Sequence, residues 1–264
     1  MDPVSAALAI AAVAGLGAAL SAAQDLAAAR EFSDTGLLSW PVTATAGSRL
    51  STRVRSLVMP ASRYRWVLWV KLLAGALAPV AALTARPAAT VLALALAVTA
   101  VLTVQRSAYG LDGSDQMSVL ALVTAAGALL AGPDSTASRV LLVFLAAQLV
   151  LSYLVAGVTK LVSPQWRSGT GLAGVFGTAE YGSAGLHAFT TRHPGLVRLA
   201  AHGTIAFECT FWVALFAPTP VLLAYLAMGL AFHLSVAVTM GLTTFVFAFP
   251  AAYPAVFWLH AVVP

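Results

Sequence analysis

Long uninterrupted apolar runs dominate the chain and are separated by polar or Gly- and Pro-containing connections. A helix that crosses the hydrocarbon core of a bilayer needs about 20 predominantly apolar residues, with a range near 17–25. We count about eight such runs. The third and fourth, Ala88–Val104 and Met117–Ala131, are short, so they could be tilted, re-entrant or merged helices, and the count of helices ranges from about seven to nine. The predicted transmembrane helices are Val4–Ala28, Trp66–Thr84, Ala88–Val104, Met117–Ala131, Arg139–Val162, Val197–Ala217, Thr219–Met240 and Thr243–Val262.

The composition agrees with a chain that lies in a membrane along its whole length. Of the 264 residues, 60% are hydrophobic and 9% are charged, and the mean hydropathy is +0.91. A soluble domain carries about 25% charged residues. Because the apolar runs are continuous rather than alternating with polar residues, they do not fit the strands of a transmembrane barrel. We predict an all-α polytopic helix bundle, a single transmembrane domain over residues 1–264, in the cell membrane.

Two long polar connections, 30–65 and 163–196, interrupt the bundle. Arg49 and Arg53 in the first are four residues apart and predict a short interfacial helix. With eight helices both connections lie on one side, and the excess of arginine there places them in the cytoplasm and both termini outside. The net charge of +5 comes almost wholly from arginine. This pattern favours anionic lipid, rather than nucleic acid, as the partner.

The segment from Gln148 to Gly169 begins as an apolar helix and ends at a polar turn. Tyr153, Gly157 and Lys160 lie at i, i+4 and i+7 and therefore share one helical face. Pro164 is expected to stop the helix, and Trp166 follows it, as is typical where a helix leaves the bilayer.

Among the ionisable residues of the last four predicted helices, three are the candidates for a site: Lys160, Glu208 and His233. A charge at the membrane centre costs at least about 2.5–3.5 kcal/mol, so such residues are candidates for function. Counted from the helix ends, Lys160 is ~3 Å, His233 ~10 Å and Glu208 ~16 Å deep. We expect all three to be reachable from one cavity on the side of the long connections. The structural alternatives are a snorkelling lysine, a glutamate that ties two helices together and a packed histidine. Because the glutamate is deep, we expect a Lys–Glu or a His–Glu pair inside the bundle.

Other candidates carry weaker signals. Asp112 and Asp115 lie in the turn YGLDGSDQM, where they serve as turn formers and a helix N-cap or as site residues. Cys209 is the only cysteine, which excludes an intrachain disulfide, and the histidines lack metal-ligand spacing, so no metal site is predicted. Nucleotide-binding and hydrolase motifs are absent.

The stretch from Tyr153 through Ala156-Gly157 and Lys160-Leu161 to Trp166 and Gly169 resembles the HTTM family, the membrane domain shared with vitamin K-dependent γ-carboxylases. The similarity covers most of the chain, with gaps. It continues at Asp25-Leu26 to Arg30, Ser33-Asp34-Thr35-Gly36, Gly110 to Gln116, Glu208, His233, Met240-Gly241-Leu242 and Phe245. Where the carboxylases have an Asn-His pair, this chain reads Gly113-Ser114-Asp115-Gln116, and the carboxylases also have a large soluble domain.

The resemblance implies a carboxylase-like lyase in which Lys160 deprotonates a reduced naphthoquinone. Reaction with oxygen then yields a strong base that removes a glutamate γ-proton, and carbon dioxide adds. Lys160, Glu208 and His233 become the candidate catalytic residues. The substrate-binding candidates are Tyr153, Gly157, Trp166, Asp112 and Asp115. The resemblance also implies that the lysine side faces away from the cytoplasm, contrary to the arginine count.

Two other functions remain open. The chain fits a non-catalytic membrane subunit or a maturation partner of another protein or secreted peptide. It also fits a small transporter in which Lys160, Glu208 and His233 relay protons, although inverted repeats are not evident. A relation to quinone-linked four-helix membrane families with an Ala-Gly-x-x-Lys pattern is a further alternative.

Overall fold

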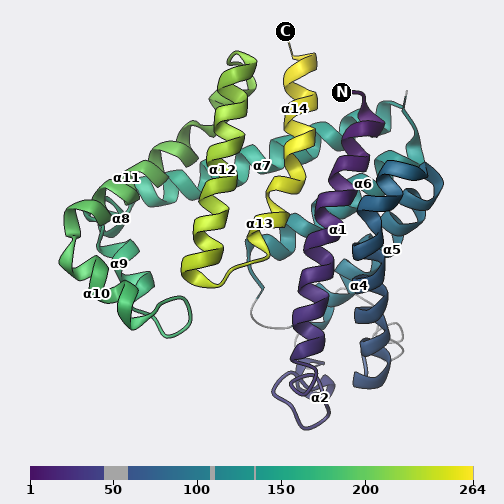
Figure 1. The fold of residues 1–264 in the computed structure, drawn as a ribbon, viewed down its shortest axis with the longest axis horizontal. Coiled ribbons are helices and arrows are strands. Elements are labelled where there is room, and N and C mark those ends of the chain that lie inside the picture. The colour runs from purple at the N-terminus through teal and green to yellow at the C-terminus, as the bar shows by residue number, and fades with distance from the viewer. Residues whose placement is uncertain (45–58, 108–110, 134, 264) are drawn as a thin grey trace. The chain divides into compact units, whose positions relative to one another are not determined.

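The computed structural model describes residues 1–44, 59–107, 111–133 and 135–263, which are helical and contain no strand (Figure 1). The predicted all-α class is confirmed. The predicted interfacial helix at Arg49 and Arg53 lies outside the described residues. The elements are α1 (Pro3–Ala27), α2 (Trp40–Thr43), α4 (Ala61–Thr84), α5 (Arg86–Arg106), α6 (Gly113–Ala131), α7 (Thr136–Val162), α8 (Pro164–Ser168), α9 (Thr170–Phe176), α10 (Ala184–Arg192), α11 (Pro194–Thr210), the 3-10 helix η1 (Phe211–Leu215), α12 (Thr219–Met240), α13 (Phe245–Ala248), the 3-10 helix η2 (Pro250–Ala252) and α14 (Tyr253–Val262).

Seven helical segments in the described part of the chain are long and apolar enough to cross a membrane. They are α1, α4, α5, α6, α7, α12 and the interrupted helix Phe245–Val262. The two segments that looked short have 21 and 19 residues as α5 and α6. The predicted helix Val197–Ala217 is different, because α11 has 17 residues and continues into η1. A multi-pass membrane protein follows, with the lower helix count of the predicted range.

The chain divides into two compact units. Unit 1 comprises Met1–Leu145 and Phe247–Trp258, and unit 2 comprises Ala146–Val246 and the residues after Trp258. Helix α7 begins in the first unit and ends in the second.

Unit 1 is built on four long helices, with α1 packed against α4 and α6, and α5 packed against the same two helices (Figure 1). Small residues allow the closest of these contacts. A Cβ at Gly15 would lie 2.7 Å from Ala78 Cβ, and a Cβ at Gly75 would lie 2.8 Å from Ala19 N. Close approach of backbones at glycine is a common way to pack helices in a membrane, where lipid removes the hydrophobic advantage of large side chains.

The end of unit 1 at which α1 and α5 end and α4 begins is closed around Arg106, and we call it the loop end. Arg106 is fully buried, and its Nε donates to Met59 O at 3.1 Å and its Nη1 to Thr43 Oγ1 at 2.6 Å. Its guanidinium carbon lies 5.3–5.7 Å from the ring centroids of Phe32, Trp40 and Tyr64. Cation–π contacts of this kind stabilise a desolvated cation by about 2 kcal/mol. The described parts of the 30–65 connection are therefore held against the end of α5.

The 163–196 connection of unit 2, which the sequence predicted to be a long loop, contains the short helices α8, α9 and α10. Ser163 caps α8 by accepting from Trp166 N, and Gly169 adopts a left-handed conformation (φ 85°) that separates α8 from α9. Ser183 caps α10 by accepting from Leu186 N. Pro164 follows the end of α7 as predicted, because proline cannot continue the preceding helix.

Candidate functional site

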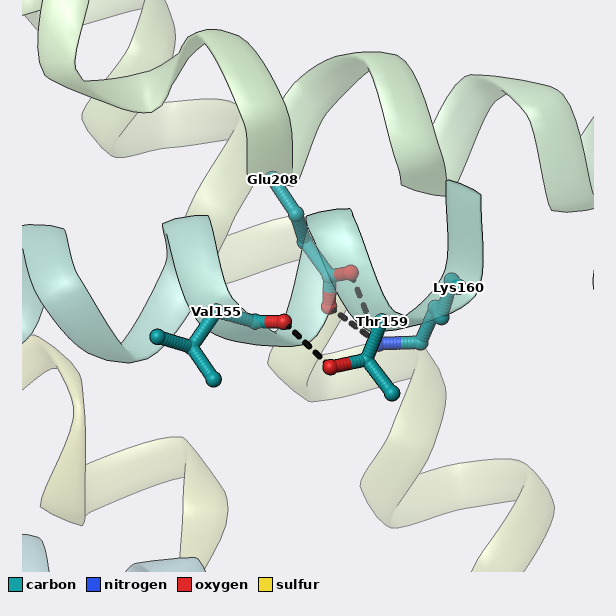
Figure 2. A network of polar contacts seen from close by, with 4 residues as sticks. All are labelled: Val155, Thr159, Lys160 and Glu208. Carbon is teal, nitrogen blue, oxygen red and sulfur yellow. Dashed lines mark hydrogen bonds and ion pairs between the residues drawn. The ribbon is translucent and has the colours of Figure 1, made fainter. Parts of the chain in front are cut away.

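The candidate site in unit 2 is an ion pair between the last turn of α7 and the end of α11 (Figure 2). Lys160 Nζ donates to both carboxylate oxygens of Glu208, at 2.8 and 2.7 Å. The Glu208 side chain is 4% exposed and the Lys160 side chain is 18% exposed. Because an isolated buried carboxylate is costly in an apolar environment, the two charges depend on each other. The two-oxygen contact also fixes the direction of both side chains.

Gly157 brings the two helices together at this pair. A Cβ at Gly157 would lie 2.7 Å from Cys209 N, 2.8 Å from Cys209 Sγ and 2.9 Å from Glu208 Cβ. Gly157 is three residues before Lys160, so both face α11. The glycine therefore lets the backbone of α11 approach α7 directly and delivers the glutamate to the lysine. Its observed role is close packing.

Tyr153 lies one turn before Gly157 and binds a different partner. Its hydroxyl is 2.8 Å from His233 Nε2 on α12, and both side chains are 2% exposed. The predicted shared face of Tyr153, Gly157 and Lys160 is thus confirmed, because all three contact α11 or α12. The three ionisable residues form two pairs rather than one triad, Lys160 with Glu208 and His233 with Tyr153.

Aromatic rings surround Tyr153 and connect the two pairs. Its ring centroid lies 5.2 Å from that of Phe207 and 4.5 Å from that of Phe211. Phe207 precedes Glu208 on α11 and also packs against Phe232, at 5.9 Å. Rings at these separations attract one another and form a rigid apolar wall.

Trp166 covers the ammonium of Lys160 from α8. Lys160 Nζ is 5.2 Å from the Trp166 ring centroid. This distance is within the range of a cation–π contact, which favours the charged amine. The grouping of Trp166 with Lys160 is therefore confirmed, and a contact of Trp166 with a ligand stays a prediction.

Asp112 and Asp115 belong to unit 1 and cap α6. Asp112 Oδ1 accepts from Ser114 N at 2.7 Å, and Asp115 Oδ2 accepts from Asp112 N at 3.0 Å. This reciprocal arrangement is a capping box, so the N-cap interpretation is confirmed. The structure leaves a further site role of these two carboxylates as a prediction.

The sequence analysis did not single out a buried lysine in unit 1, Lys71 of α4. It is 6% exposed, and its Nζ donates to Ser21 Oγ at 3.1 Å and to Thr103 Oγ1 at 3.3 Å. The signal was present, because Lys71 interrupts an apolar run in the same way as Lys160. Lys71 lies in the second predicted helix, Trp66–Thr84, outside the last four helices that contain the predicted site.

The chemistry available in unit 2 is therefore proton exchange at a charged pair. Lys160 and Glu208 can share a proton, since each is a hydrogen-bond partner of the other. Within the described residues, no group of three or more His, Cys, Asp or Glu side chains is placed to hold a metal ion. Comparison with family models, curated proteins and solved structures gives no match for this chain.

Proposed function

We propose that this integral membrane protein binds a reduced naphthoquinone or a similar lipophilic proton donor in unit 2, with Lys160 as the general base. The observation that carries the proposal is the Lys160–Glu208 pair, which joins two helices of an apolar chain through two hydrogen bonds. The resemblance to the membrane domain of the γ-carboxylases supports the same ligand class. The surroundings suit such a ligand, because the packed rings of Phe207 and Tyr153 make the neighbourhood of Glu208 apolar.

Lys160 must be neutral to accept a proton, and Glu208 provides the route to that state. Transfer of one proton from the Lys160 ammonium to the Glu208 carboxylate gives an amine and a carboxylic acid, without any change in total charge. An apolar environment favours this neutral pair more than water does, since it disfavours both charged forms. The amine then accepts the proton of the bound hydroxyl, and Trp166 stabilises the ammonium that forms.

Loss of the bound ligand on removal of Lys160 tests the proposal. Native mass spectrometry of the detergent-purified protein, followed by organic extraction, would detect a retained naphthoquinone. We expect the wild type to hold it and Lys160→Ala and Glu208→Gln to lose it. Thr159→Val is the matched control, because Thr159 Oγ1 donates only within its own helix, to Val155 O at 2.7 Å (Figure 2).

The result also separates the proposal from the alternative role as a membrane subunit or maturation partner. A wild-type protein that is empty, or that retains a second polypeptide, would overturn quinone binding. A ligand held equally by the wild type and Lys160→Ala would overturn the role of the lysine. Retention that depends on Lys160 would justify assays for carboxylation and epoxidation.

A further inference from the structure

Unit 1 contains a buried amine that the proposed function does not use. Lys71 lies about 15 Å along α4 from Ala61, well inside a membrane helix. Its two hydrogen-bond acceptors, Ser21 on α1 and Thr103 on α5, are neutral hydroxyls. An ammonium has three N–H donors, so these two bonds leave one donor for a further acceptor. Lys71 therefore lies among three helices without a carboxylate in direct contact.

Two carboxylates nevertheless act on Lys71 from a distance. Asp25 and Asp115 both interact electrostatically with its amine. Neither forms an ion pair with it, because within the described ranges the pair of unit 2 is the only one closer than 4.0 Å. Asp25 is two residues before the end of α1 and Asp115 is in the first turn of α6. Both carboxylates are thus near the helix ends, while the amine lies deeper.

Ser21 is positioned to connect the amine with Asp25. The two residues are four apart on α1, so they share one face of the helix. Ser21 Oγ accepts from Lys71, and in the described part of the chain its own hydroxyl proton has no acceptor within hydrogen-bond distance. Thr103 differs, because its hydroxyl donates to Ala100 O at 2.9 Å. A hydroxyl that accepts on one side and donates on the other can pass a proton onward.

The use of lysine along the chain supports a titrating role. The sequence has two lysines among 14 basic residues, and both are within helices that can span a membrane, one in each unit. Arginine stays charged in proteins, whereas lysine loses its proton readily when it is buried. Lys71 is therefore the buried lysine of the described chain, at 6% exposed, and arginine supplies the 12 basic side chains other than the two lysines.

We propose that Asp25, Ser21 and Lys71 form a proton-transfer path that begins at Asp25, a partly exposed carboxylate near the end of α1. Asp25 takes a proton from a hydronium ion of the solvent, which leaves water, and its carboxylate becomes a carboxylic acid. The proton then moves through a bridging water and the Ser21 hydroxyl to the Lys71 amine, which restores the carboxylate and forms the ammonium. Asp115 stabilises the ammonium from α6. The path is independent of the Lys160 site.

Hydrogen exchange of the lysine side chains tests this path directly. Selective ¹⁵N labelling of lysine gives two signals, and Lys71→Met identifies that of Lys71. We expect Ser21→Ala and Asp25→Asn to slow exchange of the Lys71 Nζ protons with water by about tenfold or more. Ser21→Ala removes the hydroxyl that passes the proton, and Asp25→Asn removes the carboxylate that takes it up. Thr103→Val also removes an acceptor of Lys71, but the Thr103 hydroxyl donates to Ala100 O and is not part of the path. Exchange of the Lys71 Nζ protons in this variant should therefore match that of the wild type.

Several outcomes would overturn the path. They are unchanged exchange in Ser21→Ala, equal slowing in Thr103→Val, or a wild-type Lys71 signal that does not exchange. The Lys160 signal in the same spectrum is the internal control and should be the same in each variant. Thermal unfolding shows whether each variant folds, and Ser21→Thr, which keeps a hydroxyl, should restore exchange if Ser21→Ala fails to fold.

Discussion

Gly157→Ala is expected to separate α7 from α11 and weaken the Lys160–Glu208 pair. The new Cβ would lie 2.7 Å from Cys209 N, whereas unstrained non-bonded contacts of carbon lie near 3.5–4.0 Å. The helices must therefore move apart by about 1 Å, because the nearest atom belongs to the backbone and cannot rotate away. Overpacking of this kind costs about 1–3 kcal/mol. A shift of that size would also lengthen at least one of the 2.7 and 2.8 Å hydrogen bonds.

The assay compares Gly157→Ala with Gly203→Ala by thermal unfolding in detergent and by retention of the proposed ligand. Gly203 also lies on α11, and a Cβ there meets nothing within 4 Å. Gly203→Ala should therefore be neutral or stabilising by up to about 1 kcal/mol, as alanine favours the helix. We expect only Gly157→Ala to lower the unfolding temperature and reduce ligand retention. Equal stability and retention in both variants would refute the close α7–α11 contact as the element that builds the site.

Three further predictions test the remaining interactions by the same unfolding measurement. Glu208→Gln should destabilise the protein by about 3 kcal/mol, because it leaves the ammonium without a counter-charge. Lys160→Met with Glu208→Leu should recover most of that loss, and equal stabilities of the two variants would argue against a coupled pair. Tyr153→Phe removes one buried hydrogen bond to the histidine of α12 and should cost about 1 kcal/mol; no loss would show that the bond contributes nothing. Asp2 caps α1, and hydrogen bonds led by that of the Ser5 hydroxyl lower the pKa of its carboxyl below 3.8. Its contribution is therefore present above pH 3.8 and lost as the pH falls through the lower folded value, a dependence that Asp2→Asn should abolish in a pH series.

Most of the helical organisation could be predicted from the sequence. The apolar runs predicted the long helices within a few residues of their observed ends, as α1, α7 and α12 illustrate. The end of α7 before Pro164 followed from the chemistry of proline. The helical period predicted that Tyr153 and Lys160 share a face. These features depend on local geometry and on the length needed to cross a bilayer, so they require no knowledge of distant contacts.

A Lys–Glu or His–Glu pair could be predicted from the cost of a buried glutamate, but the choice of Lys160 as the partner of Glu208 could not. Depths counted from helix ends put Lys160 at ~3 Å and Glu208 at ~16 Å, which assumed helices that start at a common level. Instead, their side-chain atoms are 2.7 Å apart. The two helices do not start at a common level, because α11 follows three short helices and continues into η1 rather than forming one of the seven long apolar segments.

The sequence by itself determined that the chain is a helical, multi-pass membrane protein, because hydrophobic length and charge content decide whether a helix can exist in lipid. The tertiary structure decided which buried charges meet. The missing side chain of Gly157 allows α11 to pack closely against α7, and the turns between α8 and α11 bring Glu208 to Lys160. Lys71 likewise donates hydrogen bonds to Ser21 and Thr103, which are 50 and 32 residues away in the sequence. Such contacts depend on how separate helices pack, and packing is set by many small residues together rather than by any local pattern.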